Sequence, residues 1–353
     1  MAKIKLTKGQ LYFLREKDYL TGEISRYVKI GLVRNQKETE ERISEHQTGN
    51  PREIYNYCSI ESPFVEHLET LIHYQLAEKW IIGEWLDLNE NEIEQAIKEC
   101  KEIIQEQEAI KEELEESYSL GEIQSCDDIK KPTEKSKAIW EQLIDVKLDL
   151  DQLNAKKAIV NHRLKTIMGK SDGIDGVVNL VFKDGQTRFK EKEFAEANPE
   201  LYKKYTNKET IKRSSTFTIK GKKTLRKENP ALAQEKKELE KIEVAASDIK
   251  RDQKAERNEE VVELHAQYLN LQKEIYTSEW KYTRLEAKLK VQTGKSDGIE
   301  GLCGWKRETT TTVGFNKKEL QENHPELYEE YCFTKPENFN FNVNSFRPYY
   351  VGK

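Results

Sequence analysis

The chain has 353 residues, of which 36% are hydrophobic and 35% charged, and its formal net charge is −5. This length exceeds the roughly 100–200 residues of one domain, and so much charge favours long, solvent-exposed helices over one thick core. Five scattered cysteines without a CxxC pair indicate neither a zinc site nor a disulfide framework. No run approaches the roughly 20 apolar residues that span a bilayer, so we expect a cytoplasmic chain with no membrane partner.

Residues 9–88 are expected to form a small α+β domain. Two apolar runs, 10–15 and 26–33, flank a turn-rich segment and predict a β-hairpin. A polar helix is expected over 39–47, because glycine, asparagine and proline follow it and break the pattern. Residues 53–61 predict a third strand of the same sheet.

The second helix of this domain should begin at Ser62 and Pro63, because serine is a preferred N-cap and proline is favoured at the first helical position. Leucine and isoleucine at 68, 71, 72 and 76 keep helical spacing behind it. The run GEWLDL follows at 83–88, and we expect its Trp85 to pack against the domain and close it.

Long charged helices are expected from Asn91 onward, and they belong to a duplication. Apolar residues three and four apart form a seam from Leu143 to Ile167, interrupted by Lys157, and a second seam from Tyr268 to Leu289 repeats it 125 residues later. Nearly identical segments follow each seam. They are GKSDGIDG (169–176) with GKSDGIEG (294–301), and NPELYKKY (198–205) with HPELYEEY (324–331).

Each copy is expected to form a helical hairpin followed by a glycine-rich turn, two short strands and a short helix. Glycines that end a long helix are typical of C-caps, which we favour for the GKSDGI turns over phosphate-binding loops. The predicted domains are therefore an α+β unit over 1–90 and two tandem modules over 91–228 and 229–353. The coiled-coil seams of these modules also predict a homo-oligomer.

Charge is unevenly distributed along the chain. Residues 91–137 carry fourteen acidic and seven basic side chains, whereas residues 203–227 carry ten basic and one acidic. We expect contacts with nucleic acid outside the catalytic face to come from Lys212, Arg213, Lys220, Lys222 and Lys223. The competing interpretation is an exposed basic edge strand that is protected from aggregation by its charge.

The N-terminal unit holds the residue types that phosphodiester hydrolysis needs. That reaction requires a divalent metal on a carboxylate, a cation against the phosphate oxygens and a group that orients or deprotonates water. The candidates are Tyr12, Lys29, Arg42 and Glu69. His46 and His73 each follow one of them by four residues on a helix, so they can face the same cleft. His46 is the preferred general base, although either histidine could instead serve only its helix end.

The order LYFL, VKIG, ERISEHQTGNPR, HLETLIH and GEWLDL over residues 9–88 resembles the GIY-YIG nuclease superfamily, in the phage and bacterial branch whose second tripeptide reads KIG. The resemblance implies a metal-dependent DNA endonuclease. Tyr12 matches the first tripeptide, Arg42 the residue that contacts the scissile phosphate, and Glu69 the single carboxylate that binds Mg²⁺ or Mn²⁺. Gly31 ends the second tripeptide, where the backbone passes close to its neighbours. Lys29 replaces the usual tyrosine; it can orient water only with a depressed pKa and otherwise contacts phosphate.

The repeated module is similar to the accessory C-terminal region of phage-type recombination exonucleases, which associates it with DNA processing. The sequence therefore predicts an α+β fold, with a three-stranded antiparallel sheet flanked by helices and two tandem modules behind it. The predicted function is a DNA endonuclease of phage defence or phage DNA processing. The alternative is a catalytically inactive DNA-binding or scaffold protein on the same fold, which Lys29 in place of tyrosine favours.

Overall fold

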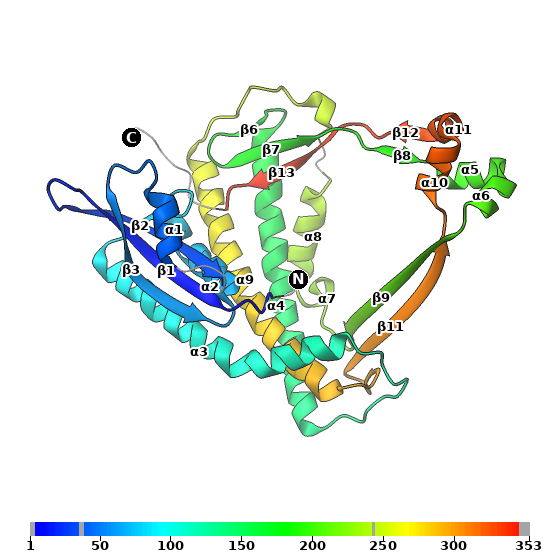
Figure 1. The fold of residues 1–353 in the computed structure, drawn as a ribbon, viewed down its shortest axis with the longest axis horizontal. Helices are drawn as coiled ribbons and strands as arrows, with labels where there is room; N and C mark the ends of the chain where they lie inside the picture. The colour runs from blue at the N-terminus through cyan, green and yellow to red at the C-terminus, as the bar shows by residue number, and fades with distance from the viewer. Residues whose placement is uncertain (1–3, 35–38, 242–243, 346–353) are drawn as a thin grey trace.

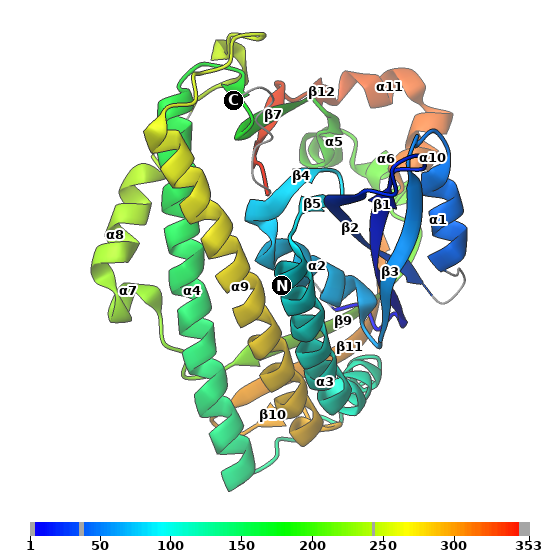
Figure 2. The ribbon, with the colours of Figure 1, turned by 90° about the vertical axis from the view of Figure 1, so that its left-hand side faces the viewer.

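The computed structural model describes residues 4–34, 39–241 and 244–345. It is a mixed α+β structure, as the sequence predicts, with an N-terminal antiparallel sheet and its helices followed by long helices and smaller sheets (Figures 1 and 2). Within these three stretches, no helix combines the length and the apolar character needed to cross a membrane.

The N-terminal unit is built on five antiparallel strands, two more than predicted. The strands are β1 (Gly9–Lys17), β2 (Ile24–Arg34), β3 (Glu53–Ser62), β4 (Trp80–Ile82) and β5 (Trp85–Asp87). Their order in the sheet is β3-β1-β2-β5-β4, so β3 and β4 are the edge strands and the GEWLDL segment supplies β5, next to β4. Along β2, the pairing with β5 covers only Tyr27 to Lys29. The edge of β2 beyond Ile30 therefore has no described strand partner on that side.

Two helices cover opposite faces of this sheet, and a third completes its core. Leu11 and Phe13 of β1 face α2 (Val65–Gln75) and the start of α3 (Glu90–Gly121), where Cys100 is the last buried residue of the cluster. Tyr12 and Leu14 point to the other face, toward α1 (Thr39–Gln47). The alternation follows from the two-residue period of a strand. The buried core of this unit therefore includes residues of α3 as far as Cys100.

The two predicted seams pack against each other within one chain. They lie on α4 (Glu134–Met168) and α9 (Glu259–Thr293), which run antiparallel side by side, with α3 against α9 (Figures 1 and 2). Lys157, the interruption of the first seam, places its ammonium 4.8 Å from the centre of the Tyr268 ring. Since each seam buries the other, the helices that predicted a homo-oligomer are already partnered inside the chain.

The strands of the two repeats pair with one another. They are β6 (Gly173–Ile174), β7 (Val178–Lys183), β8 (Thr187–Phe189) and β9 (Lys208–Ile219) in the first repeat, and β10 (Gly298–Ile299), β11 (Cys303–Gly314), β12 (Cys332–Thr334) and β13 (Asn338–Val343) in the second. β9 pairs with β11 over its whole length, β7 pairs with β13, and β8 pairs with β12. The repeats predicted as tandem modules are therefore intertwined.

Both GKSDGI turns begin as helix C-caps, which confirms the prediction. Gly169 ends α4 with a φ of 56°, and Gly294 ends α9 with a φ of 63°. Later in each turn, a Cβ on Gly173 or Gly298 would lie 2.3 Å from a backbone carbonyl oxygen of the following strand. Only glycine permits that approach, so the repeated motif is explained by backbone packing.

A small lobe lies far from the N-terminal unit, where both repeats meet again (Figure 1). It contains α5 (Glu191–Ala197), α6 (Pro199–Lys204), α10 (Lys317–Asn323) and α11 (Pro325–Glu330). Aromatic side chains from both repeats fill it, and the Phe189 ring stacks on the Tyr328 ring with centroids 4.8 Å apart. Two further helices, α7 (Leu225–Glu228) and α8 (Pro230–Leu239), pack along α4.

Candidate active site

Tyr12 is fully buried beneath α1, and its ring crosses the partner strand at Gly31. The register places Tyr12 opposite Gly31, and a Cβ on that glycine would lie 2.5 Å from the Tyr12 hydroxyl oxygen. The close approach predicted for Gly31 is therefore present, and the tyrosine ring is its cause. Burial and the negative charges of Glu84 and Glu69 raise the pKa of Tyr12, so its hydroxyl stays protonated.

Two side chains of α1 meet the Tyr12 hydroxyl. The Nε2 atom of His46 lies 3.5 Å from its oxygen, and the Arg42 guanidinium is close enough to lower the pKa of the phenol. Arg42 also pairs with Glu45, one turn further along the helix, and remains about one-third exposed (33%). Burial, together with the positive charges of Lys29 and Arg42, lowers the pKa of His46. The imidazole is therefore neutral near pH 7 and able to accept a proton.

Glu69 reaches the same region from α2, on the other side of the sheet. The charges that act on its carboxylate are those of Glu84, Arg34, Glu66 and Lys29, which places it beside the unpaired edge of β2. Burial, and then the negative charge of Glu84, raise the pKa of Glu69 to about 7. Glu69 forms no hydrogen bond or ion pair with any residue that the structure describes, so the cost of burying it is not offset locally.

Lys29 and Glu84 form an ion pair at the centre of this group. Lys29 is 7% exposed, and its ammonium contacts the carboxylate of Glu84 in the turn before β5. The charge of Glu84 acts on Tyr12, His46, Glu69 and Lys29 alike, which makes it the acidic counterpart of the site. Sequence reasoning missed Glu84. The only available signal was its place in the GEWLDL run.

His73 supports the strand that carries Lys29 and Gly31. Its Nε2 atom lies 3.0 Å from the carbonyl oxygen of Ile30, and the side chain is buried. Burial lowers its pKa, so the ring is neutral and donates to that carbonyl. His73 therefore lies behind the site, whereas Tyr12, Lys29, Arg42, His46 and Glu69 are brought together.

The residues present fit a divalent cation bound by one carboxylate. Among the described residues, no group of three or more histidine, cysteine or acidic side chains is placed to hold a metal. Glu69 is a half-buried carboxylate with a raised pKa and no ion pair with a described residue, which is the environment that a hard cation would stabilise. Mg²⁺ commonly takes one or two protein carboxylates and completes its shell with water and phosphate oxygens.

The five residues predicted to contact nucleic acid lie on another part of the molecule. Lys212 and Arg213 are exposed in β9, and Lys220 and Lys222 lie in the turn that follows it. Lys223 is already paired with Asp145 of α4, so its charge is neutralised within the chain. Lys212 and Arg213 are the stronger candidates of the five.

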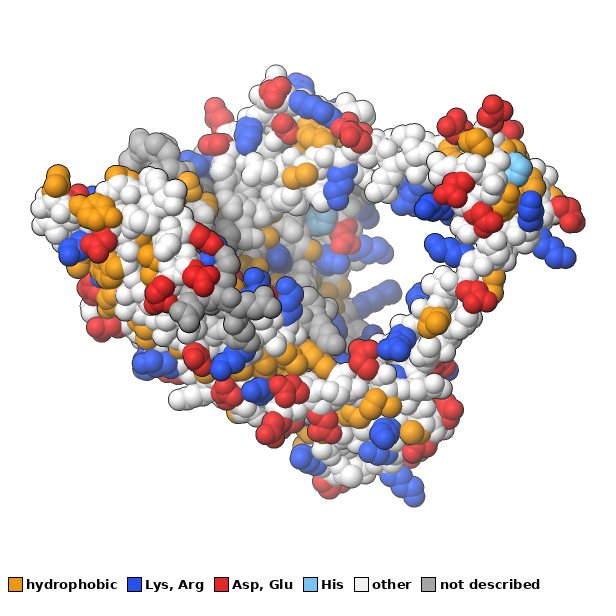
Figure 3. All heavy atoms as spheres, in the orientation of Figure 1, with side chains coloured by type: hydrophobic (Ala, Val, Ile, Leu, Met, Phe, Trp, Pro, Cys, Tyr) orange, Lys and Arg blue, Asp and Glu red, His pale blue; other side chains and the backbone are white. Residues whose placement is uncertain are grey.

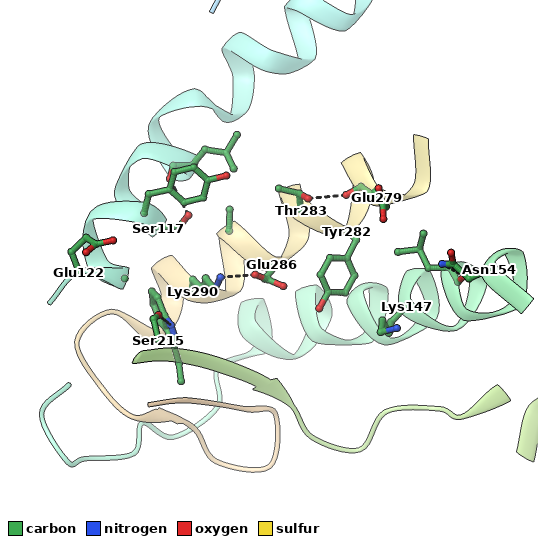
Figure 4. A pocket seen from close by; sticks show the side chains of 16 residues that line it. Ser117, Glu122, Lys147, Asn154, Ser215, Glu279, Tyr282, Thr283, Glu286 and Lys290 are labelled. Carbon is green, nitrogen blue, oxygen red and sulfur yellow. Dashed lines mark hydrogen bonds and ion pairs between the residues drawn. The ribbon is translucent and has the colours of Figure 1, made fainter. Parts of the chain in front are cut away.

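A cavity in another part of the molecule contains none of these residues. It measures about 750 Å³ and lies between α3, α4 and α9, with β9 and β11 along one side (Figure 4). Its cations have partners nearby, because Lys290 pairs with Glu286 and Lys147 pairs with Asp151. Since it holds no predicted site residue and its lysines are neutralised, we assign the cavity no part in the active site.

The site lies in a small α+β domain, where Arg42 and His46 of α1 meet the Tyr12 hydroxyl and the charge of Glu69 on α2 acts on it from the other face of the sheet. Residues 9–101 match the family model of the T5orf172 domain, a phage-associated domain related to endonucleases. The match starts with β1 and ends one residue after Cys100, so it covers the five strands, α1, α2 and the start of α3. No protein of curated function and no solved structure was found to match the chain.

Proposed function

We propose that residues 9–101 form a metal-dependent DNA endonuclease with a GIY-YIG-type site, and that the repeats behind it bind DNA. The observation that carries the proposal is the meeting of Arg42 and His46 at the Tyr12 hydroxyl, which the negative charge of Glu69 also reaches. Glu69 comes from α2, on the other face of the sheet, and its pKa is raised.

The side chains divide the work of hydrolysis among them. The exposed part of Arg42 neutralises charge that develops on the phosphorus oxygens, an effect typical of guanidinium groups in phosphoryl transfer. Neutral His46 takes the proton of the attacking water, because its lowered pKa keeps the imidazole unprotonated near neutral pH. Tyr12 is fully buried, so it is a positioning residue that orients Arg42 and His46.

Glu69 would hold the cation, and Lys29 with Glu84 would keep the charge around it balanced. Bound to Glu69, Mg²⁺ or Mn²⁺ would supply Lewis acidity to a phosphate oxygen. Deprotonation of Glu69 is needed first, so cleavage should increase as pH rises through about 7, the pKa of this carboxyl.

A plasmid-nicking assay of the full chain with Mg²⁺ or Mn²⁺ tests the proposal. The wild-type chain should relax and linearise the plasmid, and Glu69→Ala should remove that activity. Glu66→Ala is the matched control, because Glu66 lies one helical turn earlier and is already paired with Lys5 and Arg34. It should keep nearly all of the cleavage.

The same assay separates the enzyme from an inactive DNA-binding protein. An inactive protein would retard the plasmid in a gel without cutting it, whichever divalent ion is present. If the wild-type chain behaves so, or if Glu69→Ala cuts as well as Glu66→Ala, the proposed role of Glu69 is wrong.

A further inference from the structure

Two ribbons of paired strands connect the long helices with the distal lobe and enclose an opening. β9 with β11 leaves one end of the α4 and α9 pair, and β7 with β13, continued by β8 with β12, leaves the other (Figure 1). We call these ribbons the first arm and the second arm. The space-filling view shows that side chains leave the space between the arms and the helices open, and that Lys and Arg side chains project into it (Figure 3).

The first arm is exposed on both of its faces over most of its length. Every residue of β9 from Lys208 to Thr216 is exposed, as are those of β11 from Thr309 to Gly314. A two-stranded ribbon without a hydrophobic core behind it is only marginally stable in water. The length of the first arm is therefore not explained by a contribution to the stability of the fold. Such a ribbon is also an element that the major groove of DNA can admit.

The arms are basic although the chain as a whole is acidic. Residues 178–190, 208–219, 303–314 and 332–343 carry nine basic and four acidic side chains, whereas the net charge of the chain is −5. Six of these cations are exposed and form no ion pair with a described residue. They are Lys183, Arg188, Lys208, Lys212, Arg213 and Lys335.

The first arm carries an unpaired cation on each of its two faces. Lys212 and Arg213 are consecutive in β9, so their side chains point to opposite faces of the first arm. Opposite them, Thr309 to Thr312 of β11 add a row of hydroxyl groups. Lysine, arginine and threonine are the side chains that contact the phosphates of nucleic acids, independently of base sequence.

The dimensions of the frame suit a duplex. The helices α4 and α9 have 35 residues each, which corresponds to about 50 Å of length. The first arm has 12 residues per strand and is about 40 Å long. Both lengths exceed one helical turn of duplex DNA, which is about 34–36 Å.

We propose that the opening between the arms binds double-stranded DNA, with the unpaired cations of both arms on its phosphates. This inference rests on the proposed function only for the identity of the nucleic acid. The arms would hold the duplex independently of its sequence, and the N-terminal unit would cut it.

Fluorescence anisotropy with a labelled duplex tests this, using the full chain with Glu69→Ala in EDTA so that cleavage plays no part. One double variant neutralises each arm, Lys212→Gln with Arg213→Gln and Arg188→Gln with Lys335→Gln. The control is Lys98→Gln with Lys101→Gln, which removes two exposed lysines from α3, away from the arms. Thermal melting should be unchanged in all three, because every altered side chain is exposed.

Each arm variant should weaken binding at low salt by at least tenfold. It should also reduce the slope of log affinity against log salt by about 2, since each lost phosphate contact removes roughly 0.9 from that slope. Arm variants that bind as tightly as the control would overturn the proposal, as would tighter binding of a single strand or of an acidic protein. A wild-type chain that never cuts DNA, while the arms bind it, would refute only the nuclease.

Discussion

Replacing Glu69 with glutamine tests the electrostatics of the site without any substrate. In the folded chain the pKa of Glu69 is about 7, against an ordinary value of 4.5. Each pKa unit corresponds to about 1.36 kcal/mol, so ionising this carboxyl costs the folded state roughly 3 kcal/mol. Glutamine keeps the shape of the side chain and has no charge to desolvate.

The sign of the effect follows from where each state loses its proton. Below pH 4.5 the carboxyl of Glu69 is protonated in both the folded and the unfolded chain, so its stability contribution is fully present. Above pH 4.5 the carboxyl of Glu69 ionises more readily in the unfolded chain than in the folded chain. Its contribution to the free energy of unfolding is therefore lost as pH rises through about 7. In EDTA at about pH 8, Glu69→Gln should therefore exceed the wild type in free energy of unfolding by roughly 3 kcal/mol. In acid the two should be nearly equal.

Urea unfolding followed by circular dichroism, at about pH 5 and pH 8, measures this difference. Adding Mg²⁺ at the higher pH should stabilise the wild type and leave Glu69→Gln unchanged, because only the wild type can bind the cation. Glu66→Gln is the control with the opposite sign, since Lys5 and Arg34 lower the pKa of Glu66 and its removal should cost stability at the same pH. If Glu69→Gln is less stable than the wild type in EDTA, or gains as much from Mg²⁺, the account of this carboxylate is wrong.

Three further substitutions test other parts of the structure. Gly31→Ala should cost about 1–3 kcal/mol of stability and reduce cleavage, because the new Cβ would meet the buried Tyr12 ring. Thermal melting measures the first effect and the nicking assay the second. A fully active variant would contradict this geometry. Burial lowers the pKa of His67 to about 4, so stability is lost as pH falls from 6.5 toward 4. The melting temperature of His67→Phe should therefore fall less on acidification than that of the wild type. An equal fall in the two proteins would refute this. Arg307 donates to three backbone carbonyls, so Arg307→Lys should lower the free energy of unfolding by roughly 2–3 kcal/mol, and an unchanged urea midpoint would count against that role.

The N-terminal elements could be predicted because their signals are local. The helix expected over 39–47 has those bounds in the structure, since three breaking residues stand directly after it. The strand expected over 10–15 extends to Gly9–Lys17. A close backbone approach was also expected at Gly31, and the structure places the Tyr12 ring against it.

Other features depend on partners that are distant in sequence. Ser62 does not cap α2, because that helix begins at Val65. The Ser62 hydroxyl instead donates to the side-chain oxygen of Gln107, 45 residues later, over 2.7 Å, and accepts a hydrogen bond from the Phe64 amide. Glu84 lies in a turn between two three-residue strands, where no periodicity marks it. The exchange of strands between the repeats could not be predicted, because two nearly identical copies offer each strand equivalent partners within and between them.

The exchange of strands also determines when the C-terminal half can fold. The side chain of Asn344 bonds to the carbonyl of Gly176, 168 residues earlier, and β7 has no long partner until β13 has been made. In a nascent chain, the first arm therefore cannot close until β11 has left the ribosome, nor the second until β13 has, while the N-terminal unit can assemble much sooner. During that interval β7 and β9 present unpaired edges, so this half of the molecule depends most on rapid completion of synthesis or on chaperones.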